Sequence, residues 1–104
     1  MIITTTERIP NREAIEILGV CRGSTVRARS VFSDFFAGLK NIVGGEIDQY
    51  TKLQADSREQ AMERMIKDAA KMRADAIVNV RLTTSTVMSG ASEILAYGTA
   101  VKLS

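Results

Sequence analysis

The sequence predicts an α+β fold in which an antiparallel sheet packs against one short and one long helix. Two observations indicate this class. Runs rich in β-branched residues lie near both ends of the chain, and two segments with helical spacing of apolar residues lie between them. The 104 residues suffice for one domain, and no linker divides residues 1–104.

The first part of the chain favours strands. Residues 1–5 are apolar and β-branched, and they predict a short first strand. Residues 13–31 alternate, which indicates either two strands or one long bent strand with a turn or bulge at Gly23–Ser24. Strict alternation places Ile17 and Cys21 on one face, and Leu18 and Val20 on the other.

Two helices are predicted next. Apolar residues recur at helical spacing over residues 32–43, Ser33 or Asp34 can cap the start, and Gly44–Gly45 can end the helix. Residues 46–73 predict a long helix, in which Arg64 and Asp68 have the i,i+4 spacing of an ion pair. A polar stretch around Ser57 resembles a capping box, so the helix either continues there or kinks.

Residues 76–86 and 93–103 predict a hairpin whose two faces are both apolar. In the last run, one face carries Leu95, Tyr97, Val101 and Leu103. The other face carries Ile94, Ala96, Gly98 and Ala100. A hairpin with one side in water normally alternates with polar residues, so both faces need a cover.

These features predict self-association. A straight helix over residues 46–73 is about 42 Å long, whereas a compact monomer of this size is roughly 33 Å across. Either the helix breaks near Ser57, or a second copy covers the overhang and the spare sheet face. We expect a homo-oligomer.

Composition excludes several functions. With no histidine there is no Ser–His–Asp triad, Cys–His pair or histidine-ligated zinc, and one cysteine excludes an internal disulfide. A net charge of +2 gives no reason to expect nucleic acid or an anionic membrane. No apolar run reaches the roughly 18–20 residues of a membrane span. We expect a cytoplasmic protein with reduced Cys21.

Each of the polar candidate residues allows two interpretations. Cys21 is one soft donor where zinc usually takes four, so it is either a small buried hydrophobe or a metal ligand gathered by ring symmetry. Asp34, Tyr50 and Arg58 lie near helix ends or the polar stretch. They are either capping and surface residues or parts of a ligand site. No spacing of acids indicates general acid–base catalysis, so we expect no enzyme and no bound cofactor.

Several motifs together resemble the YbjQ-like family of small prokaryotic proteins, which carry a heavy-metal-binding label. The matching stretches are VFSDFFAGLKNIVGG (31–45), Tyr50, SREQAMERM (57–65), ADAIVNVR (74–81) and GTAVK (98–102). The resemblance implies an α+β domain assembled as a homopentameric ring. Arg73 stands where this family usually has glycine, so we expect a different C-cap on the long helix.

Three hypotheses follow from these observations. The first is a non-catalytic, self-assembling protein that binds a small ligand of unknown identity at its subunit interfaces. The second is a soft heavy-metal-binding protein that uses Cys21. The third is an enzyme with an inter-subunit polar site formed by residues such as Asp34, Tyr50 and Arg58.

Overall fold

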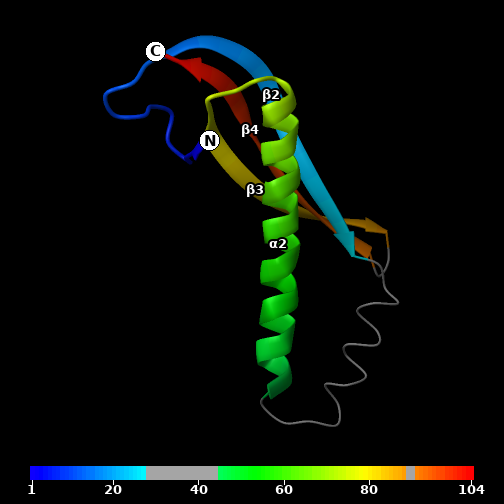
Figure 1. The fold of residues 1–104 in the computed structure, drawn as a ribbon. Coiled ribbons are helices and arrows are strands. Elements are labelled where there is room, and N and C mark those ends of the chain that lie inside the picture. The colour runs from blue at the N-terminus through cyan, green and yellow to red at the C-terminus, as the bar shows by residue number, and fades with distance from the viewer. Residues whose placement is uncertain (28–44, 89–90) are drawn as a thin grey trace.

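A computed structural model describes residues 1–27, 45–88 and 91–104, with backbone alone for residues 27, 45–54 and 87. One helix, α2 (Gly45–Lys71), crosses one face of a four-stranded sheet (Figure 1). The strands are β1 (Ile2–Ile3), β2 (Ala14–Arg27), β3 (Ala76–Met88) and β4 (Ala91–Leu103), in the order β1-β3-β4-β2. The α+β class is confirmed. The predicted short helix over residues 32–43 lies outside the described residues.

The sheet is mixed rather than wholly antiparallel. β4 pairs antiparallel with both β2 and β3, but β1 runs parallel to β3, with Ile2 opposite Ala76 and Ile3 opposite Ile77. The prediction of an antiparallel sheet is wrong at this edge. Two residues are too few for the sequence to indicate which strand they join.

The alternation predicted for β2 is also wrong, because the strand contains two bulges. β2 is one continuous strand of 14 residues, and its register with β4 shifts between Ala14 and Glu16 and again between Ile17 and Gly19. Each extra residue reverses the order of faces that follows it. Cys21 is consequently buried, whereas Ile17 and Val20 are 74% and 63% exposed. No register shift occurs at Gly23–Ser24, where the sequence suggested one.

The helix is continuous through Ser57, so the predicted kink is absent. Ser57 is buried at 2% exposure, and its carbonyl accepts a hydrogen bond of 3.1 Å from the hydroxyl of Thr25 on β2. The residues of α2 that are buried against the sheet recur every fourth position: Ser57, Ala61, Met65 and Ala69. Three of these four side chains are small, which lets the helix approach the sheet closely.

The face of the sheet beneath α2 forms the main core. Its buried members include Cys21, Ile77, Val80, Ile94, Ala96 and Ala100. The opposite face has a smaller core where Ile9, from the segment before β2, covers Ala76, Val78, Val101 and Leu103. The prediction that β4 has two apolar faces is therefore confirmed, with Ile94, Ala96 and Ala100 on one face and Val101 and Leu103 on the other.

The C-terminal end of α2 is a Schellman motif. Ala74 N donates to Ala69 O at 3.2 Å, and Arg73 N donates to Ala70 O at 3.0 Å. Arg73 has a left-handed φ of 60°. The expectation of a different C-cap is wrong, because arginine takes the backbone conformation that glycine favours.

The molecule is elongated. Its principal extents are 55 × 26 × 18 Å, and the Cα radius of gyration is 17.1 Å, against about 13 Å for a compact chain of this length. Figure 1 shows the reason: the C-terminal half of α2 lies across the sheet and the N-terminal half extends beyond the strands.

Candidate functional site

The three predicted ligand-binding residues are not brought together by the described part of the structure. Asp34 lies outside the described residues, and for Tyr50 the structure describes the backbone, within α2. Arg58 is exposed on the same helix, eight residues and about two turns further on. A ligand site built from these residues stays a prediction.

Cys21 lies on β2 beneath α2 and is fully buried. Its thiol donates a hydrogen bond of 3.6 Å to the carbonyl of Gly98 on the neighbouring strand. Burial and the Asp68 carboxylate both raise the pKa of the Cys21 thiol above its ordinary value of 9.0. The thiol is therefore protonated at neutral pH, and a metal would reach it only after α2 moved.

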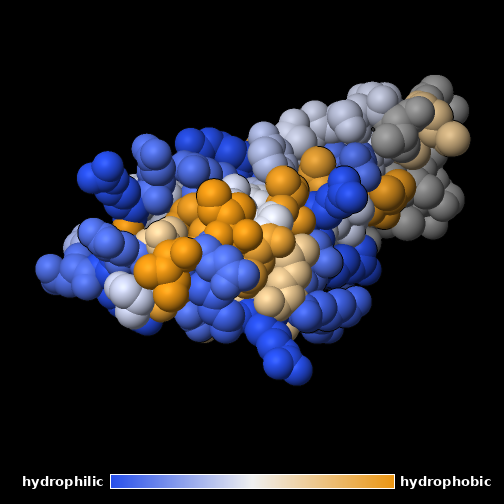
Figure 2. All heavy atoms as spheres, turned by 90° about the horizontal axis from the view of Figure 1, so that it is seen from above, coloured by the Kyte–Doolittle hydropathy of each residue, from blue (hydrophilic) through white to orange (hydrophobic). Residues whose placement is uncertain are grey.

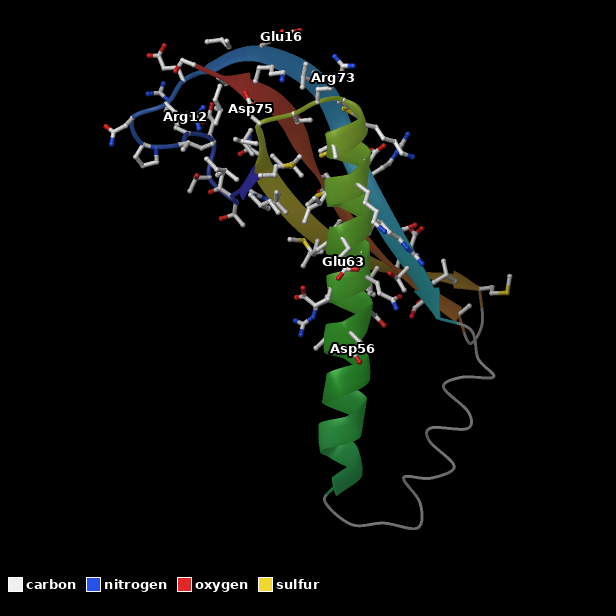
Figure 3. All side chains as sticks on the ribbon, viewed as in Figure 1. Arg12, Glu16, Asp56, Glu63, Arg73 and Asp75 are labelled. Atoms are coloured by element: carbon white, nitrogen blue, oxygen red, sulfur yellow. The ribbon has the colours of Figure 1, made fainter. Side chains whose placement is uncertain are left out.

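Metal donors are scattered in the described part of the chain. No group of three or more His, Cys, Asp and Glu side chains there is placed to hold an ion. In Figure 3 two acidic residues, Asp56 and Glu63, lie at separate points along α2, and Asp75 follows its C-terminal end. Asp75 already accepts a hydrogen bond of 2.9 Å from Leu103 N and lies 3.9 Å from Lys102 Nζ.

The outer face of the sheet exposes apolar side chains. We use the name outer patch for five residues of β2 and β4: Ile17, Val20, Val26, Leu95 and Tyr97. Leu95 is half-buried and the other four are exposed. Figure 2 shows exposed apolar side chains grouped on one face of the molecule and bordered by hydrophilic ones. Such a surface is typical of a site that binds another protein.

The edge of β2 that faces away from β4 carries two unexpected contacts from α2. The Asp68 carboxylate accepts a hydrogen bond of 3.0 Å from the backbone N–H of Arg22, and the Arg64 guanidinium donates to the carbonyl of Ser24. Sequence spacing predicted an ion pair between Arg64 and Asp68. Each side chain instead bonds the strand, because the helix lies close to this edge.

A hollow of about 910 Å³ lies beside the segment before β2. Ile9, Val78 and Leu103 are among its apolar lining residues. Arg12, labelled in Figure 3, donates from both Nε and Nη2 to the carbonyl oxygen of Ser104 at 3.2 Å. This arginine holds two chain segments together with two of its N–H donors.

Fold and surface together define a small α+β domain with one helix-covered sheet face and one partly open face. Within the described ranges, no helix has both the length and the apolar character of a membrane span. The chain belongs to the YbjQ-like family, whose model, described as "Putative heavy-metal-binding", matches residues 1–104. The predicted family is therefore confirmed.

Relatives match over nearly the whole chain. A UPF0145 protein of Archaeoglobus fulgidus is 63% identical over 103 residues, which cover 99% of this chain and 95% of the relative. One of Shewanella frigidimarina is 54% identical, covering 99% and 96%. A crystal structure of a protein of unknown function from Pediococcus pentosaceus has a TM-score of 0.65 at 18% identity, covering 100% of this chain and 98% of that one. That likeness supports the fold.

Proposed function

We propose that this protein is a non-catalytic, self-assembling protein whose subunits associate through the outer patch. The observation that carries the proposal is the exposure of Ile17 and Val20 at 74% and 63%, on the same side of the sheet as the exposed Tyr97. Water contact with this much apolar surface is unfavourable, at roughly 25 cal/mol per Å².

The occupant that we propose for the outer patch is a second copy of this chain. The extended shape supports this, because a chain with extents of 55 × 26 × 18 Å hides less of its own surface than a compact one. The continuous α2 supports it as well, since the kink that would have shortened the helix is absent. The family resemblance implies a pentameric ring, which requires heterologous contacts repeated around an axis.

The proposal locates the protein in the cytoplasm, where a lone cysteine stays reduced. A small ligand would bind between subunits, where residues from two copies meet. The subunit count is measured by native mass spectrometry, which we expect to give five.

Val20→Lys tests the assembly. A charge at Val20, within the outer patch, should weaken association by at least about tenfold, which corresponds to roughly 1.4 kcal/mol. Sedimentation velocity over a concentration series measures this. Ala70→Lys is the matched control, because Ala70 is exposed on α2. Equal assembly of Val20→Lys and wild type, or a monomeric wild type at micromolar concentration, would refute the proposal.

A second candidate is soft-metal binding, which the description of the family favours. Here Cys21 is the expected ligand, and its complete burial means that binding would have to displace α2. Cadmium titration by calorimetry, with Cys21→Ser as the comparison, tests this candidate. Stoichiometric uptake that the substitution abolishes would support it, and uptake that is the same in both proteins would exclude Cys21.

A further inference from the structure

The side of β2 that faces away from β4 is a free sheet edge. β2 ends the order β1-β3-β4-β2, so one row of its backbone N–H and C=O groups has no strand partner among the described residues. Fourteen residues make a long edge, and the exposed side chains of Val20 and Val26 lie along it on either side of Arg22 and Ser24. Such an edge is a template for adding another strand, and natural proteins usually protect it.

Two side chains of α2 already occupy the middle of this edge. Asp68 Oδ2 accepts from Arg22 N at 3.0 Å, and Arg64 Nη1 donates to Ser24 O. The acceptor is negatively charged and the donor is positively charged, so both hydrogen bonds are charge-assisted. An incoming strand needs the same two backbone groups, and both are taken.

The spacing of residues along the helix and along the strand explains how two charged residues of α2 can bond two successive outward-facing residues of β2. Arg64 and Asp68 are four residues apart on α2, a rise of about 6 Å. Arg22 and Ser24 are two residues apart on β2, about 6.6 Å along the strand. The outward-facing groups of an edge strand recur at this two-residue interval. One turn of helix therefore matches one repeat of the strand edge.

The closeness of the helix also has a cause in the sequence. Gly23 lies between the two bonded strand residues, and a Cβ built on it would be 2.5 Å from both Ala61 O and Arg64 Cβ. Without a side chain at Gly23, α2 approaches the strand closely enough for Arg64 and Asp68 to reach around its edge.

We propose that Arg64 and Asp68 form an edge guard, which prevents a strand of a second copy from adding to β2. The guard goes beyond the proposed function, because it concerns the sheet edge rather than the outer patch. It keeps association finite, since strand addition at an open edge can repeat without closing.

The double variant Arg64→Ala/Asp68→Ala tests the guard. We expect the Arg22 amide to exchange its hydrogen at least about tenfold faster, as expected when one hydrogen bond is lost. We also expect species larger than wild type to grow with time in light scattering, with increased thioflavin T fluorescence. The matched control is Glu63→Ala/Lys67→Ala, which removes one acid and one base with the same spacing on the same helix and should behave as wild type.

A suppressor variant separates edge pairing from unfolding. Arg22→Pro added to the double variant removes the edge N–H that an incoming strand would bond, while the contacts of β2 with β4 stay. We expect it to restore the wild-type size distribution. Growth that persists with Arg22→Pro, growth in the control variant, or a double variant with wild-type size and Arg22 exchange would overturn the proposal. Failure of assembly at the outer patch would leave this result unchanged, because every variant is compared with wild type.

Discussion

Gly23 on β2 lies directly against the carbonyl of Ala61 on α2, where an added Cβ would be 2.5 Å from that oxygen. The same Cβ would also meet Met65 N. This contact sets the distance between helix and sheet over the main core. The packing of these two elements therefore depends on the absence of one side chain.

Gly23→Ala should destabilise the fold by about 1–3 kcal/mol, because two of the atoms that the added Cβ would meet, Ala61 O and Met65 N, are backbone atoms that cannot turn aside. Urea unfolding measures the change. Ser24→Ala, at the next residue, is the control and should stay within about 0.5 kcal/mol of wild type. A Gly23→Ala protein as stable as this control would show that α2 can shift without cost.

The pH dependence of stability should report the buried thiol of Cys21. Burial raises its pKa in the folded protein above 9.0, so the folded state holds the proton more tightly than the unfolded state. The resulting stabilisation is fully present below pH 9.0 and is lost as the pH rises through the folded pKa. Unfolding free energies of wild type and Cys21→Ala, measured from pH 7 to 11, should converge at the alkaline end. A constant difference would contradict the raised pKa.

Arg73→Gly should stabilise the protein by about 1 kcal/mol. Arg73 has a φ of 60°, a left-handed conformation that costs non-glycine residues roughly 1–2 kcal/mol. Thermal unfolding checks the prediction. Arg73→Ala is the control, because it removes the charge but keeps the strained backbone, and it should resemble wild type. Equal effects of the two substitutions would assign any change to the lost guanidinium.

Thr25→Val should cost about 1 kcal/mol of stability. Thr25 is 3% exposed, and its hydroxyl donates to Ser57 O at 3.1 Å, a bond that the isosteric valine cannot make. Chemical unfolding measures the loss. The same substitution at exposed Thr84 should leave stability unchanged. If Thr25→Val and Thr84→Val have the same free energy of unfolding, the hydroxyl of Thr25 contributes nothing to holding α2.

Local patterns in the sequence were sufficient to predict several features of the protein. The predicted helix over residues 46–73 and the observed Gly45–Lys71 differ by one residue at the start and two at the end. The two faces of β4 follow simple alternation, because that strand keeps its register with β2 from Val20 to Arg27. The family motifs also identify the chain over its full length.

The sequence alone could not show on which face of the sheet each side chain of β2 lies. The shifts at Ala14/Glu16 and Ile17/Gly19 exist only relative to β4, about 80 residues away, and they turned Cys21 inward and Ile17 outward. The side-chain contacts at the sheet edge could not be predicted from the sequence either. Charge spacing on α2 indicated an Arg64–Asp68 ion pair, and only the nearby strand edge explains why both side chains bond backbone instead.

The sequence by itself determined the class of fold, the long helix, the alternation of β4 and the family, because these depend on residues close together in the chain. The tertiary structure decided which apolar residues of β2 stay exposed and how near α2 lies to the sheet. It also decided which backbone groups at the edge of β2 bond to side chains of α2. Those features depend on distances between backbone segments far apart in sequence, where a single bulge or a missing Cβ changes which atoms meet.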